Sequence, residues 1–167
     1  MNMSKIIEQY RDAQEAFLKD YFETVVAKAR DYTVYDMLPQ KECMWMKEWI
    51  SSNLENEIVD KELAAAIIIS SDSKYRWEVY THLYDHTRLT PEAIGYCFGE
   101  AYVFGVFTRD DIEHYSQGID KKHLMTEDEI KFIENLPDMV TIYRGTSKEE
   151  ANSQKYGTSW TMDIDTA

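Results

Sequence analysis

Apolar side chains at helical spacing run through most of this chain, and this pattern constrains the fold more than any other feature. Near the N-terminus they recur at steps of three and four residues, which places them along one face of a helix. The members of this stripe are Ile6, Ile7, Tyr10, Ala13, Phe17, Tyr21 and Val25. Only 6 Gly and 3 Pro interrupt the 167 residues, so long helices are expected. The sequence therefore predicts a mainly α protein whose first helix spans Ser4–Arg30.

Start and stop signals divide the rest of the helical sequence. We expect a connector over Asp31–Pro39, with Pro39 in the first turn of a helix that runs to about Ser52. A further helix is expected over Glu55–Ser70, because the alanines within Leu63–Ile69 favour helix over strand. Capping residues and apolar spacing predict later helices over 74–87, from 90 onward, over 108–117 and over 126–136.

The composition changes at Pro137, after which the sequence favours strands. Val140–Arg144 is apolar and β-branched, and a second strand is expected near Gly157–Thr161. We therefore predict a helical bundle-like domain over residues 1–137 and a short, β hairpin-like appendage over 138–167, which makes the protein α+β overall.

The charge balance is strongly acidic, with 31 Asp and Glu against 18 Lys and Arg and a net charge of −13. A protein that binds nucleic acid directly normally carries the opposite sign, so this class is disfavoured. Two interpretations stay open: a solubilising surface, or a mimic of nucleic acid that faces a basic groove. On the first helix, acids lie mostly off the apolar stripe and predict an acidic outer face; they are Glu8, Asp12, Glu15, Asp20 and Glu23.

Two further groups of acids stand at predicted helix starts, where the helix dipole favours negative charge without any partner. They can also contribute to a partner-binding face. They are Asp110, Asp111 and Glu113 in the first group, and Glu127, Asp128 and Glu129 in the second.

Metal and nucleophile motifs are weak in this sequence. Cys43 and Cys97 stand alone, which argues against a disulfide framework or a zinc site. His82 and His86 are four apart, as in a shared metal site, but no third ligand is identifiable, so a role at the helix surface is favoured. We assign no metal ligand and no catalytic residue.

Close helix packing and a cytoplasmic location are also expected. Gly95 and Gly99 lie four apart and would let another helix approach closely. The surrounding aromatic residues favour a helical core over a ligand pocket. No apolar run reaches the roughly 18–20 residues of a membrane span, and the N-terminus lacks a signal-peptide pattern, so the protein is predicted to be cytoplasmic.

One stretch near the C-terminus suggests a specific chemistry. An Arg at the end of a strand can hold a phosphate with two hydrogen bonds, and Ser159 and Thr161 would face the same side of a neighbouring strand. Ile142–Gly145 followed by Gly157–Thr161 resembles the first half of an ADP-ribosyltransferase-like domain found in bacterial and phage proteins, in which a YRG strand precedes a G-x-SWT strand. The resemblance implies that Arg144 holds NAD and that Ser159 and Thr161 order the nicotinamide pocket.

The strand that carries the catalytic Glu in that family has no counterpart in this sequence. We therefore expect either a piece of a longer enzyme or a protein that keeps the first half of the domain without its chemistry.

Three functional hypotheses follow from these observations. The first is an acidic protein of phage or mobile-element type that binds and inhibits a basic, nucleic-acid-binding host protein, as an anti-CRISPR or other anti-defence inhibitor does; it needs no cofactor. The alternative is an ADP-ribosyltransferase or an NAD-binding module. The third is a helical oligomerisation or regulatory module of a longer polypeptide.

Overall fold

The protein is mainly helical, as the apolar spacing predicts. The computed structural model describes residues 3–28, 33–103, 107–117, 119–153, 161–163 and 165. Contacts divide the chain into two compact units, Met1–Leu124 and Met125–Ala167. Each unit is described by itself below. The boundary precedes Pro137, so helix α8 (Glu127–Glu134) groups with the segment that follows it.

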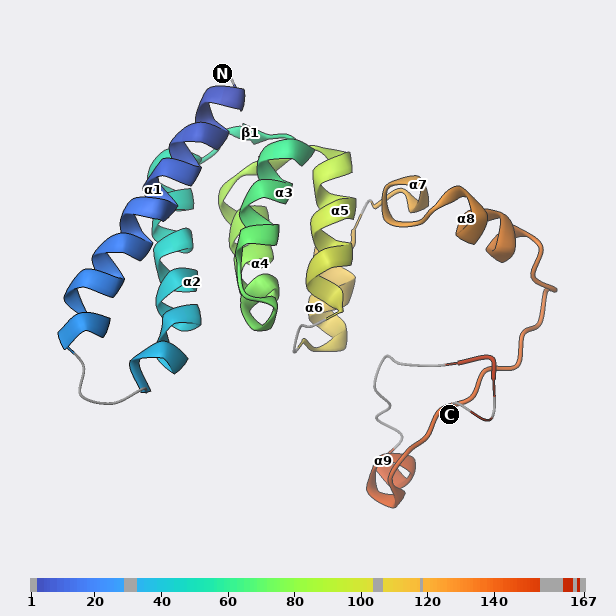
Figure 1. The fold of residues 1–167 in the computed structure, drawn as a ribbon. Helices are drawn as coiled ribbons and strands as arrows, with labels where there is room; N and C mark the ends of the chain where they lie inside the picture. Colours follow the sequence, from blue (N-terminus) through green and yellow to red (C-terminus); the bar gives the residue numbers. More distant parts are fainter. Residues whose placement is uncertain are drawn as a thin grey trace. The chain divides into compact units, whose positions relative to one another are not determined.

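The first unit contains most of the helices that the structure describes. Figure 1 shows α1 and α2 side by side and running in opposite directions, with α3 and α4 next to them and α5 beyond α3 and α4. The elements of this unit are α1 (Met3–Thr24), η1 (Val26–Lys28), α2 (Thr33–Asn53), β1 (Ile58–Val59), α3 (Lys61–Ser70), η2 (Ser73–Tyr75), α4 (Arg76–His86), β2 (Arg88–Leu89), α5 (Pro91–Tyr102), α6 (Arg109–Tyr115) and α7 (Lys121–Leu124).

Two very short strands connect helices of this unit: β1 lies between α2 and α3, and β2 lies between α4 and α5. β1 and β2 are parallel, with Ile58 opposite Arg88 and Val59 opposite Leu89. The helix that follows each strand begins with a side-chain cap. Asp60 accepts a hydrogen bond from the backbone of α3, and Thr90 accepts one from the backbone of α5. These caps satisfy N–H groups that have no partner within the helix.

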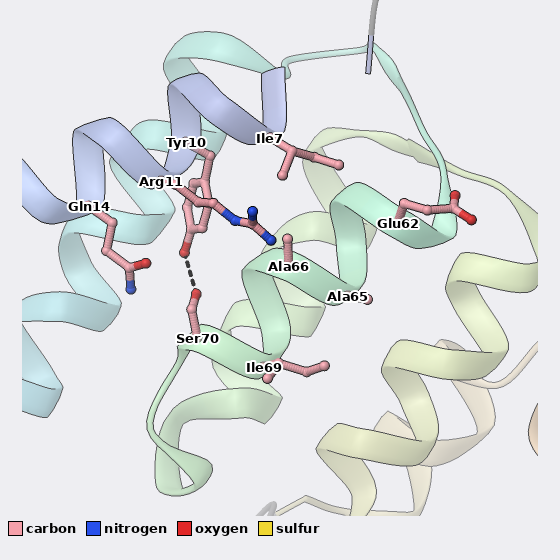
Figure 2. Close-up of a pocket in the computed structure, with 9 residues that line it drawn as sticks. All are labelled: Ile7, Tyr10, Arg11, Gln14, Glu62, Ala65, Ala66, Ile69 and Ser70. Atoms are coloured by element: carbon pink, nitrogen blue, oxygen red, sulfur yellow. Dashed lines mark hydrogen bonds between the residues drawn. The ribbon is translucent and has the colours of Figure 1, made fainter. Parts of the chain in front are cut away.

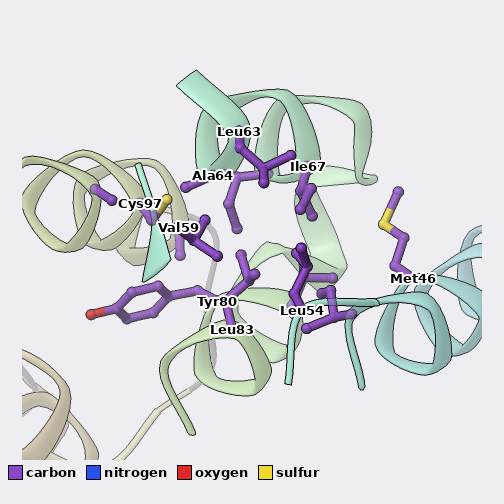
Figure 3. Close-up of a cluster of buried hydrophobic side chains, with 14 of the residues drawn as sticks. Met46, Leu54, Val59, Leu63, Ala64, Ile67, Tyr80, Leu83 and Cys97 are labelled. Atoms are coloured by element: carbon purple, nitrogen blue, oxygen red, sulfur yellow. The ribbon is translucent and has the colours of Figure 1, made fainter. Parts of the chain in front are cut away.

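The core of the first unit lies around α3, which packs against α1, α4 and α5. Figure 3 shows side chains from α2, α3, α4 and α5 and from β1 meeting there. The run of alanines and isoleucines is helical as predicted: Leu63, Ala64, Ile67 and Ile68 are buried, whereas Ile69 is 55% exposed. The predicted aromatic core is present too, with Trp77 and Phe98 buried and their rings 6.0 Å apart.

The predicted single helix over Ser4–Arg30 is too long, and the predicted connector over Asp31–Pro39 is wrong from Thr33 onward, where the chain is helical. α1 ends at Thr24, whose hydroxyl donates to the carbonyl of Asp20 over 2.6 Å. α2 begins at Thr33 and contains Pro39 within it.

Proline in a helix interior removes one backbone hydrogen bond and costs about 3 kcal/mol. Packing on α1 compensates for this cost at the first turns of α2. The Tyr21 hydroxyl donates to the Val34 carbonyl over 2.5 Å, and the Phe22 and Tyr35 rings lie 6.4 Å apart.

The helix expected over Glu55–Ser70 starts later than predicted, at Lys61. Asn56 adopts a φ of 60°, which is incompatible with a helix, and the next residues pair with β2. A two-residue strand is too short to produce an alternating pattern, so periodicity does not reveal it.

The two glycines of α5 allow a close helix contact, as expected. α7 lies directly over Gly95, where an added Cβ would come within 2.6 Å of the His123 Cβ. At Gly99 the nearest atom is Leu124 Cδ1, at 3.4 Å.

The second unit contains α8, α9 (Lys148–Ser153) and an antiparallel bridge between Tyr143 and Thr161. Within the described residues, the strand expected over Val140–Arg144 is reduced to the single pairing at Tyr143. Most of the second expected strand, including Ser159, lies outside the described residues.

Candidate functional site

In the segment that resembles an ADP-ribosyltransferase, one residue of the first motif, Tyr143, pairs with the one described residue of the second, Thr161. The Tyr143 N–H donates to the Thr161 carbonyl over 2.6 Å, and the Thr161 N–H donates back over 3.0 Å. Residues paired in this way project their side chains to one face, and the next residue projects to the other. Thr161 therefore shares a face with Tyr143, and the described pairing does not extend to Arg144. The bridge alone does not bring Arg144 and Thr161 into one pocket.

Two of the six acids proposed for partner binding serve as helix caps. The Asp111 carboxylate accepts hydrogen bonds from the Thr108 N–H and hydroxyl, both over 2.7 Å. These hydrogen bonds lower the pKa of Asp111. Glu129 forms the same capping box with Thr126, and its pKa is lowered for the same reason.

The other four acids at these helix starts are exposed. Glu113 pairs with Arg109 over 2.8 Å, and Asp128 lies 3.8 Å from Lys131. Asp110 stands in the first turn of α6, and Glu127 in the first turn of α8. α6 belongs to the first unit and α8 to the second, so the two groups of acids are not placed on one described surface.

The outer face of α1 carries four carboxylates, and the exposed Lys5 and Lys19 lie on the same arc of the helix. We call Glu8, Asp12, Glu15 and Glu23 the α1 acidic face; all four are exposed. At about 100° per residue they fall within about 80° of the helix circumference, and at about 1.5 Å per residue they extend over about 22 Å. Tyr10 and Tyr21 are buried on the opposite side. The sequence predicted an acidic outer face with five members; the fifth, Asp20, is exposed but lies outside this arc.

His82 and His86 lie together on α4, with their ring centroids 4.1 Å apart. The Nε2 of His82 is 2.9 Å from the Lys47 carbonyl and 2.8 Å from the Ser51 hydroxyl. A carbonyl only accepts hydrogen bonds, so Nε2 carries the proton. That nitrogen then has no lone pair to accept the serine proton, and the Ser51–His82 pair is not arranged as nucleophile and base.

The surroundings of this histidine pair indicate a structural role. Burial, followed by the neighbouring His86, lowers the pKa of His82. His86 Nδ1 contacts the Glu55 carboxylate at 3.0 Å. In the described part of the chain, no group of three His, Cys, Asp or Glu side chains is placed to hold a metal ion.

An apolar hollow between α1 and α2 was not anticipated from the sequence. Its volume is about 430 Å³. Its lining comes from one face of each helix and from the residue that follows α1: Phe17 and Tyr21 from α1, then Val25, and Met37, Lys41, Met44, Trp45 and Glu48 from α2. The signal in the sequence is the spacing of four, three and four residues from Met37 to Glu48, which places these side chains on one stripe of α2.

A second hollow lies between α1 and α3 and has a volume of about 500 Å³. Figure 2 shows Ala65 and Ala66 on the α3 side and the Arg11 side chain reaching across from α1. At one end the Tyr10 and Ser70 hydroxyls are joined by a hydrogen bond of 2.6 Å. The bond fixes α1 on α3, so these two hydroxyls serve packing.

Comparisons with known proteins do not indicate which class of protein this chain belongs to. No family model, curated protein or solved structure matches this chain. Among the described residues, no helix is long and apolar enough to cross a membrane.

Proposed function

We propose that this protein acts by binding a partner with a basic surface, and that the partner is a nucleic-acid-binding protein such as a host defence nuclease. The α1 acidic face is the observation that carries the proposal. Its carboxylates are exposed and aligned along one helix, in a chain with a net charge of −13. A groove that binds nucleic acid presents Lys and Arg to a row of phosphates, and a row of carboxylates competes for the same cations.

This mode of action requires no catalysis and no cofactor. The chain would occupy the groove in place of nucleic acid and inhibit the nuclease in the cytoplasm, as an anti-CRISPR protein or another phage anti-defence protein does. Charge complementarity would speed association, and salt would screen it over a Debye length of about 8 Å at physiological ionic strength.

The experiment measures DNA cleavage by a purified Cas9-type RNA-guided nuclease in the presence of this protein, at low and high salt. The α1-face variant converts the four acids of that face to Gln or Asn. The control variant removes the same negative charge from four exposed acids of the second unit that belong to neither proposed binding group: Glu134, Asp138, Glu149 and Asp165.

Inhibition that weakens with salt, and that the α1-face variant loses while the control variant retains it, supports the proposal. Equal loss in both variants would show that net charge alone is responsible. Unchanged inhibition between low and high salt would refute the electrostatic mechanism, and cleavage unaffected by excess protein would exclude this nuclease class as the target.

The alternative function, NAD binding or ADP-ribosyl transfer, is favoured by one observation, the pairing of Tyr143 with Thr161. This pairing joins the two motifs that carry the resemblance. Isothermal titration with NAD tests it, because Arg144 would hold the diphosphate. Binding that Arg144→Ala abolishes and Lys148→Ala preserves would support this function. No heat of binding at millimolar NAD would reject it.

A further inference from the structure

The surface of α2 beside the α1–α2 hollow is unusually apolar for an acidic protein. Met37 and Met44 are 47% and 50% exposed, and Val25, which follows the facing helix, is 39% exposed. Met44 also lines a third hollow, of about 340 Å³, which Tyr75 and Glu78 line as well. The exposed Met44 side chain therefore stands as a ridge between two depressions. Methionine fills irregular apolar spaces readily, which suits such a ridge to packing against another protein.

Two opposite charges flank Met44 on the same face of α2. Lys41 and Glu48 both line the α1–α2 hollow, and both are exposed. They are seven residues apart, which is about two helical turns or about 10 Å along the axis. Neither residue makes an ion pair within the part of the chain that the structure describes.

The arrangement of Lys41, Met44 and Glu48 is self-complementary under a two-fold rotation. A two-fold axis through the point midway between Lys41 and Glu48, at Met44 and Trp45, reverses the direction of α2. Lys41 of one copy then meets Glu48 of the other, and the same pair forms again on the other side of the axis. Isologous contacts of this kind are the commonest in soluble oligomers.

We propose that the α1–α2 hollow is a homodimer interface, in which the α2 helices of two copies pack antiparallel. The Met44 side chain of each copy enters the hollow of the other and contacts Phe17, Tyr21 and Trp45. Two Lys41–Glu48 pairs close the ends of the contact and set its register. This inference is independent of the proposed function, because it does not involve the α1 acidic face.

The charge of the chain is compatible with this contact. On α1, the residues that line the hollow and those of the α1 acidic face point in opposite directions around the helix. The acidic faces of two copies therefore point away from the interface, and their repulsion is screened by salt. A basic amphipathic helix of another protein is the competing occupant, but the lysine in the hollow lining does not favour it.

Charge reversal tests the register directly. Sedimentation equilibrium measures the dimer dissociation constant of wild type, Lys41→Glu, Glu48→Lys and the double variant. Each single reversal replaces two attractive pairs with two repulsive ones. We therefore expect the dimer dissociation constant of each single variant to be at least tenfold higher than that of wild type. The double variant restores both pairs and is expected to dimerise within a fewfold of wild type.

A mixture of the two single variants provides a second, independent readout. One carries only Glu at both positions and the other only Lys, so the mixture is expected to form heterodimers while each variant alone stays monomeric. Lys19→Glu, an exposed charge reversal on the outer side of α1, serves as the control and should dimerise as wild type. Met44→Lys tests the apolar centre and should abolish dimerisation with an unchanged circular dichroism spectrum.

Several outcomes would overturn the inference. Wild type that is monomeric at several hundred micromolar would reject a homodimer. A dimer that neither single reversal weakens would place the interface elsewhere. A dimer that the single reversals weaken and the double reversal does not restore would contradict the antiparallel pairing.

Discussion

Replacing the glycines of α5 with alanine tests the packing of α7 on α5. Both Gly95 and Gly99 lie inside the helix, where alanine is intrinsically favoured by about 1 kcal/mol. At Gly95, however, the new methyl group would lie 2.6 Å from His123 Cβ and 2.8 Å from the His123 carbonyl oxygen. The carbonyl is backbone and cannot move without shifting α7. Such overpacking costs about 1–3 kcal/mol, which outweighs the gain in helix propensity.

Gly99→Ala is the matched control, because its methyl group would meet only Leu124 Cδ1 at an ordinary contact distance of 3.4 Å. Urea unfolding followed by circular dichroism measures both variants. We expect Gly99→Ala to raise the free energy of unfolding by about 0.5–1 kcal/mol and Gly95→Ala to lower it by about 1 kcal/mol. Faster hydrogen exchange in α7 should accompany only the second change. If both variants are stabilised equally, α7 does not pack on α5 as described.

Three further predictions concern individual side chains. The pKa of His82 is lowered, so the folded state takes up a proton at this residue less readily than the unfolded chain, and the free energy of unfolding should fall as pH drops below about 6.5. Urea titrations at pH 7 and pH 5 should show a smaller loss for His82→Gln than for wild type, but not for the exposed His114→Gln. Burial raises the pKa of the Cys43 thiol to about 11 and that of the Cys97 thiol to about 12. Both thiols should therefore resist a thiol reagent at pH 8 until the protein is unfolded, and the free energy of unfolding should decline as pH rises above 9. Rapid labelling of the native protein would contradict this burial. Thr90→Ala removes the side-chain cap of α5 and should lower the free energy of unfolding by about 1 kcal/mol, whereas Thr90→Ser should retain most of it.

Local signals in the sequence account for much of the helical framework. The caps at Thr90, Thr108 and Thr126 lie where the residue types indicate, because a side chain that caps a helix acts within three residues of itself. The alanines between Leu63 and Ile69 favour helix for the same local reason. Where tertiary contacts compete with local preference, the predictions are wrong. Pro39 lies inside α2 because the helix packs on α1, and β1 interrupts the expected helix because a partner strand is present.

The same distinction between local signals and tertiary contacts applies to the candidate sites. The α1 acidic face could be predicted because all of its members lie on one helix. The spatial neighbours of His82 could not, because Ser51 is 31 residues away in the chain. The α1–α2 hollow likewise requires two helices at a particular distance, which periodicity does not supply.

The sequence by itself determined the fold class, the positions of most helices and the acidic outer face of α1, because spacing, capping and side-chain charge act over a few residues along the chain. Only the tertiary structure decided that Met44 stands between two hollows with Lys41 and Glu48 on either side, and that α7 crosses Gly95. These features depend on which helix faces meet, and that is set by packing between segments far apart in the sequence.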